Sequence, residues 1–338
     1  MTLERHRRFD DTHGYAGAGA AIGSLGALVA ACRALAGAAA GFSPAEEVLV
    51  RRAGPVDPSL VDALRALIEA GEDPLGEAFC LLRPPAERRP SGAVYTPRPV
   101  VDSMVAWAAE QPRPCRIVDP GCGSGRFLLA AGRRFPTAEL VAVETDPLAL
   151  LMLRANAAVL GLTARLTVHH DDYRRLTLPE TTGRTLFIGN PPYVRHHDID
   201  PLWKTWFAET ARRYGLKASK LAGLHIHFFL KTRELGRRGD FGCFITAAEW
   251  LDVNYGAVLR RLLADGLGGT ALHVLAPESM PFGDAITTGA VTCFHLGRTA
   301  PRLTVRWARH VRELAPLSAG TPVPWSALDG AARWTPII

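Results

Sequence analysis

The fold of this chain is decided by the stretch Ile117-Val118-Asp119-Pro120-Gly121-Cys122-Gly123-Ser124-Gly125. An apolar pair leads into an acid, and glycines then alternate with small residues before a helical pattern begins at Phe127. Glycines in a strand-to-helix turn let the backbone approach a ligand closely, and the helix start presents N–H groups that have no partner within the helix. The stretch therefore predicts a ligand-binding loop at the end of a buried strand.

This loop lacks the signatures of two common nucleotide sites. The Lys-Ser/Thr pair of a P-loop is missing, and Leu128 occupies the final glycine position of the dinucleotide fingerprint G-x-G-x-x-G. What remains is a loop with Asp119 at the strand end, which suits a zwitterionic, cationic ligand such as S-adenosylmethionine. The alternative is a tight turn that binds nothing.

Acidic residues end the next two predicted strands. Glu144 follows the glycine loop by about 20 positions, the spacing at which an acid accepts hydrogen bonds from ribose hydroxyls. Asp146 is better explained as the N-cap of the following helix. After the third strand, Asp172 is the favoured acceptor for an adenine amine because an aromatic residue follows it, and Asp171 remains the alternative.

A second motif, Asn190-Pro191-Pro192-Tyr193, follows the apolar run 185–188 and Gly189. The two prolines fix φ and withhold two backbone donors, so the carbonyls of Asn190 and Pro191 are not claimed by a strand ladder. The result is a rigid rim with an amide oxygen, a backbone carbonyl and a flat ring, which suits a planar group bearing an amine. Asn-Pro is also an ordinary turn signal, and that alternative stays open here.

The chain alternates strand and helix patterns after a helical first part. Residues 1–88 read as helical, with a capping box at Ser43 and Glu46, and Thr96 is expected to cap a helix over residues 98–110. Such alternation predicts an α/β fold with an open, mostly parallel sheet covered by helices on both faces. The expected strands are residues 116–119, 139–143, 166–169, 186–188, 242–246, 272–276 and 290–296.

Composition describes a globular chain of 338 residues, with 48% hydrophobic and 21% charged residues and a net charge of +6. The modest basic balance is compatible with a polyanionic partner. Six cysteines without a C-x-x-C pair indicate reduced thiols and a cytoplasmic protein. The apolar run 15–41 consists mainly of Ala and Gly and contains Arg33, so it predicts a packed helical hairpin and no membrane span.

Taken in order, these motifs resemble the gamma-class adenine-N6 DNA methyltransferases of restriction–modification systems. The placement of Tyr95-Thr96-Pro97 ahead of the glycine loop is the hallmark of that class. The resemblance covers about residues 83–297, and it includes Ser279-Met280-Pro281-Phe282. One departure is Gly121, where the family usually has Ala.

The resemblance implies a Rossmann-like sheet of seven strands whose last strand, residues 290–296, runs antiparallel. It divides the chain into an N-terminal helical region (1–88), an S-adenosylmethionine-dependent methyltransferase domain (89–300) and a C-terminal strand with a linker-like tail (301–338). No full target-recognition domain is recognisable in the sequence. A separate specificity chain is therefore a possible partner, besides double-stranded DNA.

The resemblance also implies roles for individual residues. The Asn190 side-chain oxygen and the Pro191 carbonyl would accept the two N6 hydrogens of an adenine flipped out of the duplex. Tyr193 would stack on that base, and Phe282 would contact it from another side. S-adenosylmethionine would be held by Tyr95, Thr96, Asp119, Gly121, Gly123, Gly125, Glu144 and Asp172.

Several weaker signals leave alternatives open. The basic segment 195–238 is a candidate DNA-facing region through Arg195, Lys217 and Lys220, although a solvated helix face explains it equally well. His196-His197-Asp198 is not expected to hold a metal, and His225 and His227 are expected to pack within a helix. Two other functions compete: a protein glutamine or RNA methyltransferase, and a methylase-like subunit that is active only with a partner chain.

Overall fold

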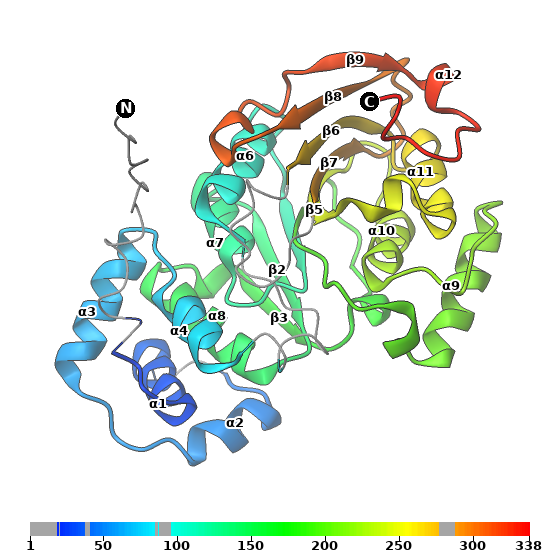
Figure 1. Cartoon of the computed structure of the whole chain (residues 1–338). Helices are drawn as coiled ribbons and strands as arrows, with labels where there is room; N and C mark the ends of the chain where they lie inside the picture. Colours follow the sequence, from blue (N-terminus) through cyan, green and yellow to red (C-terminus); the bar gives the residue numbers. More distant parts are fainter. Residues whose placement is uncertain (1–18, 20, 38–40, 85–86, 88–95, 277–287) are drawn as a thin grey trace, which may run out of the picture.

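One sheet runs through the computed structural model, which describes residues 19, 21–37, 41–84, 87, 96–276 and 288–338 (Figure 1). Its nine strands lie in the order β3-β2-β1-β4-β5-β7-β6-β8-β9. Strand β7 is antiparallel to β5 and β6, β9 is antiparallel to β8, and the other neighbours are parallel. The strands are β1 (Arg116–Pro120), β2 (Glu139–Glu144), β3 (Leu166–His170), β4 (Thr185–Gly189), β5 (Phe241–Ala247), β6 (Gly269–Leu275), β7 (Gly289–His295), β8 (Arg302–Ala308) and β9 (Thr321–Pro324).

The α/β class, the mostly parallel sheet and the antiparallel strand over residues 290–296 are confirmed, but the number of strands is wrong. All seven predicted strands form, and β8 and β9 extend the sheet beyond β6. The buried side chains of Leu303 and Val305 alternate with more exposed ones along β8, which is the pattern of a half-covered strand. Strand β9 is short and contains two prolines, a composition that is tolerated at a sheet edge.

Helices cover both faces of the sheet because its central strands are buried on both sides. Along β1, Ile117 packs with α6, α7 and α8, whereas Val118 packs with α10 and α11 on the other face. This arrangement explains why β1, β4 and β5 are continuous runs of buried residues. The helices are α1 (Leu25–Ala36), α2 (Pro44–Arg51), α3 (Pro58–Glu69), α4 (Pro74–Leu82), α6 (Arg98–Ala109), α7 (Arg126–Arg134), α8 (Pro147–Val159), α9 (Pro201–Arg213), α10 (Leu224–Leu235), α11 (Ala257–Ala264) and α12 (Trp325–Leu328).

The N-terminal helices α1 to α4 form a group that packs on α8 (Figure 1). Helix α8 is apolar around most of its circumference, because Leu150 and Leu153 face the sheet while Leu151 and Met152 face α1 and its neighbours. A helix that is buried on two sides requires such a sequence. The predicted capping box at Ser43 and Glu46 is present at the start of α2.

The apolar run 15–41 was expected to form a helical hairpin. Its described part contains one helix, α1, whose residues Leu28, Ala31 and Cys32 are fully buried. In the part of the chain that the structure describes, no helix is both long enough and apolar enough to cross a membrane.

The tail expected to be linker-like instead packs on the sheet. Trp334 is buried between Trp250 and Trp325, with ring centroids 5.9 and 5.7 Å away. Its backbone N–H donates to Leu251 O at 3.0 Å. Aromatic side chains spaced along a Pro-rich tail supply enough apolar surface to hold that tail in place.

Candidate functional site

The glycine loop joins β1 to α7 in a conformation that favours glycine. Gly121, Gly123 and Gly125 have φ values of 73°, 54° and 93°. A Cβ at Gly125 would lie 2.4 Å from Leu153 Cδ1, so this glycine lets the loop pack against α8. A Cβ at Gly123 would meet nothing within 4 Å, so this part of the backbone is open to an approaching ligand.

Asp119 lies behind this loop. It is completely buried, and its Oδ2 accepts a hydrogen bond from Leu128 N at 3.1 Å. Burial raises its pKa well above the ordinary value. A Cβ at Gly189 would come within 2.4 Å of Asp119 Oδ1, so β4 makes room for this carboxyl by having glycine there. Asp119 therefore holds the start of α7 from behind the loop, and it is not among the residues that line the neighbouring cavity.

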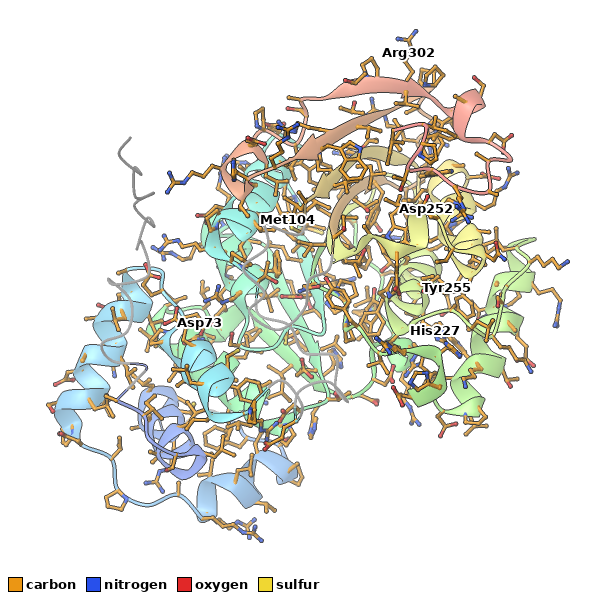
Figure 2. The ribbon with its side chains drawn as sticks, in the orientation of Figure 1. Asp73, Met104, His227, Asp252, Tyr255 and Arg302 are labelled. Atoms are coloured by element: carbon orange, nitrogen blue, oxygen red, sulfur yellow. The ribbon has the colours of Figure 1, made fainter. Side chains whose placement is uncertain are left out.

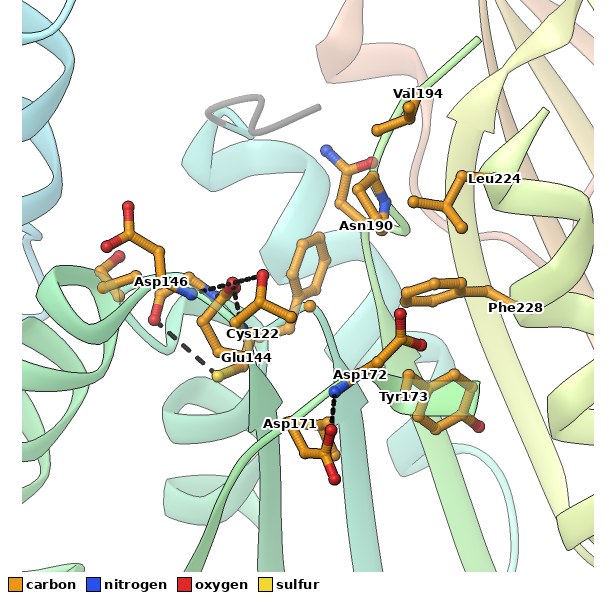
Figure 3. A pocket seen from close by; sticks show the side chains of 18 of the residues that line it. Cys122, Glu144, Asp146, Asp171, Asp172, Tyr173, Asn190, Val194, Leu224 and Phe228 are labelled. Atoms are coloured by element: carbon orange, nitrogen blue, oxygen red, sulfur yellow. Dashed lines mark hydrogen bonds between the residues drawn. The ribbon is translucent and has the colours of Figure 1, made fainter. Parts of the chain in front are cut away.

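A cavity of about 390 Å³ opens beside the loop, at the carboxyl ends of β1, β2 and β4. Ligands of open α/β sheets bind at this edge. Glu144 lies on one side of it, Asn190 and Val194 lie on another, and Asp172 and Phe228 lie below Asn190 in this view (Figure 3). The predicted site residues that line the cavity together are Thr96, Gly121, Gly123, Glu144, Asp172 and Asn190. Gly125, like Asp119, is absent from this lining.

The Glu144 carboxylate is fixed by backbone donors. Its Oε2 accepts from Gly123 N at 3.0 Å, and its Oε1 accepts from Thr145 N at 2.7 Å and Asp146 N at 3.1 Å. Burial raises the pKa of Glu144, and these bonds oppose that rise. The carboxylate thus ties β2 to the glycine loop. Asp146 Oδ1 accepts from Leu148 N at 2.9 Å, which confirms its predicted role as N-cap of α8.

Both candidate acids after β3 line the cavity, but they differ in their surroundings. The Asp172 side chain is 22% exposed, and Arg174 holds it through Nε at 2.9 Å and Nη2 at 2.5 Å. The Asp171 side chain is 56% exposed and lies 3.8 Å from Arg175 Nε. A bidentate guanidinium fixes a carboxylate in one orientation. The more rigid acid is therefore Asp172.

Asn190 follows β4 and is oriented by a residue far away in the sequence. Its Nδ2 donates to Thr96 Oγ1 at 3.0 Å, and Thr96 is 2% exposed. The expectation that Thr96 caps a helix is wrong, because α6 has Pro97 at its N-cap and no side-chain cap bond. The Thr96 hydroxyl is committed to the amide instead. Tyr95 and Phe282, both predicted from the resemblance, lie outside the described residues.

Tyr193 and Pro191 are close to Asn190 in the chain but do not line this cavity. The Tyr193 hydroxyl donates to Ile245 O at 3.5 Å, and its ring meets His225 edge to face at 6.4 Å. His225 and His227 are buried in α10, which confirms their prediction as packing residues. His227 stacks on Phe207 at a centroid distance of 4.2 Å.

The lining also includes residues that were not predicted as site residues, among them Arg126, Trp203 and Phe228. Trp203 comes from α9, and Arg174 lies over its ring at 4.1 Å. Trp203 lies within the basic segment 195–238, and Phe228 directly follows His227, a predicted packing residue, so neither stood out as a site residue. Arg126 directly follows the glycine loop, which is the signal that would have found it.

The candidate DNA contacts are surface residues outside the lining of the cavity. Arg195, Lys217 and Lys220 are exposed, and none of them lines it. Among the described residues there is no group of His, Cys, Asp and Glu side chains that could hold a metal ion, and His197 pairs with Asp198 at 3.3 Å.

Comparison with known proteins agrees with this geometry. Residues 179–275 match the family described as Eco57I restriction-modification methylase, and residues 117–213 match a methyltransferase domain family. The chain is 52% identical over 314 residues to type II methyltransferase M.XamI of Xanthomonas campestris pv. amaranthicola. That match covers 92% of this chain. The resemblance to restriction–modification methyltransferases is confirmed.

Two more comparisons delimit this relationship. The chain spans 59% of the length of the type II methyltransferase M.XamI. The release factor glutamine methyltransferase of Mycolicibacterium smegmatis is 38% identical over 115 residues, covering 32% of this chain and 39% of that protein. A Listeria monocytogenes structure described as a putative class I S-adenosylmethionine-dependent methyltransferase superposes with a TM-score of 0.61 at 11% identity, covering 86% and 87% of the two chains. The two chains therefore share a fold.

Proposed function

We propose that the chain is a DNA methyltransferase that transfers a methyl group from S-adenosylmethionine to N6 of a flipped-out adenine in a restriction–modification system. The observation that carries this proposal is the position of Asn190. It directly follows β4, lines the same cavity as Gly121 and Glu144, and its amide is held by Thr96. The identity to a type II methyltransferase supports DNA as the substrate.

The cavity fits the proposed cofactor. Gly123 leaves room for close approach, Glu144 places a carboxylate beside the loop, and Asp172 lies further along the same cavity. These groups suit a ligand that combines an ammonium group, ribose hydroxyls and an adenine amine. Phe228 and Trp203 add aromatic surface for a flat ring. When bound there, S-adenosylmethionine supplies an electrophilic methyl group.

The residues around Asn190 would position the acceptor nitrogen. Asn190 Nδ2 donates a hydrogen bond to Thr96 Oγ1, so the side-chain oxygen Oδ1 is the atom of the amide that would accept a hydrogen bond from the base. Asn190 Oδ1 and the Pro191 carbonyl oxygen would each accept a hydrogen bond from the amino group of adenine N6. These hydrogen bonds strengthen as N6 turns toward sp³. Catalysis then consists of positioning and electrostatic stabilisation without a titrating base. Tyr193, with Phe282, would stack on the flipped base, and base–aromatic stacking contributes ~1–3 kcal/mol.

The test is Asn190→Ala in the full chain, assayed with labelled S-adenosylmethionine and DNA. We expect methylation to be abolished while cofactor affinity survives, and near-normal turnover would refute the role of Asn190. Tyr193→Ala should mainly weaken capture of the base. Unchanged turnover together with retained tight binding to abasic or mismatched DNA would contradict stacking.

A second candidate function is methylation of a protein glutamine, which the similarity to a release factor glutamine methyltransferase favours. An Asn-Pro-Pro-Tyr rim also suits a glutamine amide. Incubation of the purified chain with labelled cofactor and either DNA, RNA or protein extract separates the candidates. Label in DNA that maps to N6-methyladenine supports the first, label only in protein supports the second, and label only in RNA contradicts both. Activity that appears only after a partner chain is added would mean that a specificity subunit is required.

A further inference from the structure

Asp73 is a buried acid in the N-terminal helical region that makes its bonds across the boundary with the sheet domain. It is 7% exposed and lies at the start of α4 (Figure 2). Its Oδ2 accepts from Ser124 Oγ at 2.5 Å and from Arg126 Nε at 2.9 Å. Its Oδ1 accepts from Gly76 N at 3.0 Å and Asn156 Nδ2 at 3.2 Å.

From Asp73 a continuous path of hydrogen bonds leads to Asn190. Arg126 bonds Asp73 through Nε and donates through Nη1 to Thr96 O at 2.6 Å. Thr96 Oγ1 then accepts from Asn190 Nδ2 at 3.0 Å. Two planar charged groups and one buried hydroxyl therefore connect α4 to the end of β4.

We propose that Asp73 is a positioning residue, which sets the orientation of the Asn190 amide through Arg126 and Thr96. The proposal rests on the function proposed above for Asn190. Because a guanidinium has fixed fork geometry, a carboxylate that holds Nε also fixes where Nη1 points. Without Asp73, Arg126 would no longer hold the Thr96 backbone in one place, and the amide would lose its support.

The same carboxylate holds Ser124 of the glycine loop. Asp73 therefore links the loop that borders the cofactor cavity to the residue that would receive the acceptor nitrogen. Asp73 itself does not line that cavity, so its substitution cannot remove a direct cofactor contact there. This makes it a cleaner probe than Arg126, which does line it.

The experiment measures kcat at saturating DNA and S-adenosylmethionine, cofactor Kd and Tm for Asp73→Asn, Thr96→Val and the double variant of the full chain. We expect Asp73→Asn to lower kcat by about tenfold or more, since small misplacements far from the chemistry cost up to about a hundredfold. Cofactor Kd should change by a smaller factor. In the Thr96→Val background the path is already broken, so Asp73→Asn should lower kcat less than about threefold further.

Two results would overturn the proposal. One is a lower Tm of Asp73→Asn with unchanged kcat, and the other is a double variant whose fold-loss in kcat equals the product of the losses in the two single variants. If Asp73→Asn does not fold, Arg126→Lys replaces it, because an ammonium cannot reproduce the fork that joins Asp73 to Thr96. Glu72→Gln is the matched control, since Glu72 pairs with Arg98 at 2.8 Å instead of with Arg126.

Asn190→Ala separates the proposed role of Asp73 from the proposed function of the chain. If that variant remains active, the proposed function fails; if it is inactive while Asp73→Asn has normal kcat, only the role of Asp73 fails.

Discussion

At the scale of single residues, His225 makes stability depend on pH. Its ring is buried beside Tyr193, and burial lowers its pKa to about 4, although the nearby Glu249 carboxylate opposes that shift. Because the folded pKa lies below the ordinary value near 6.5, the neutral ring stabilises the fold above about pH 6.5. That contribution is lost as the pH falls toward 4.

We expect this single group to lower the free energy of unfolding by about 2 kcal/mol between pH 7 and pH 5. His225→Phe keeps a flat ring without a proton site and should lack this part of the acid loss, which denaturant unfolding at each pH measures. His197→Phe is the control, because the His197 side chain is 59% exposed and should leave the loss in place. Equal pH dependence of the wild type and His225→Phe would contradict the expectation.

The residues of the site were easier to predict than their partners. Glu144, Asp172 and Asn190 lie at the end of a strand or within two residues after it, and parallel strands bring their carboxyl ends to one edge of the sheet. The bond from Asn190 to Thr96 spans 94 positions, and no local pattern encodes such a distance. Because its partner is distant in the sequence, Thr96 was predicted as a helix cap, and Asp73 was not predicted as a site residue.

At the scale of elements, the strands buried on both faces were the predictable ones. Strands β4 and β5 are mostly apolar runs between breakers, and this signal does not depend on knowing their neighbours. Strands β8 and β9 form because the end of the chain has apolar surface to bury against β6 and α11. Strand β9 is short and contains two prolines, so local propensity argued against it, whereas β8 has no proline and corresponds to the C-terminal strand that the sequence predicted.

The packing of this C-terminal segment predicts a difference between two tryptophans. Trp334 is 2% exposed, whereas Trp307 on β8 is 45% exposed. Removing a buried tryptophan costs about 3–5 kcal/mol, whereas substitutions on the surface cost about 0.5 kcal/mol. Trp334→Ala should therefore destabilise the chain far more than Trp307→Ala in chemical denaturation. Equal losses would show that the segment does not contribute to the cooperative core.

At the scale of the whole molecule, the net charge of +6 does not reveal where a polyanion would bind. Lysine is more informative, because this chain has many arginines and only four lysines: Lys204, Lys217, Lys220 and Lys231. The first three of these lie on α9 or the segment that follows it. Lys217 and Lys220 are exposed, as is Arg195 just before α9, so this part of the surface is the one to test for contact with a DNA backbone.

Replacement of Arg195, Lys217 and Lys220 by Gln should weaken DNA binding at low salt and reduce its salt dependence. Each phosphate contact that is lost lowers the slope of log K against log salt concentration by about 0.9, because fewer counterions are released on binding. A matched variant removes three exposed arginines elsewhere, Arg52, Arg113 and Arg302, and so changes net charge equally. If both variants lose the same slope, the effect belongs to net charge, and the segment around α9 has no special part in DNA binding. If only the variant of Arg195, Lys217 and Lys220 loses slope, contacts to the DNA phosphate backbone are assigned to this segment, which also supplies Trp203 to the cavity.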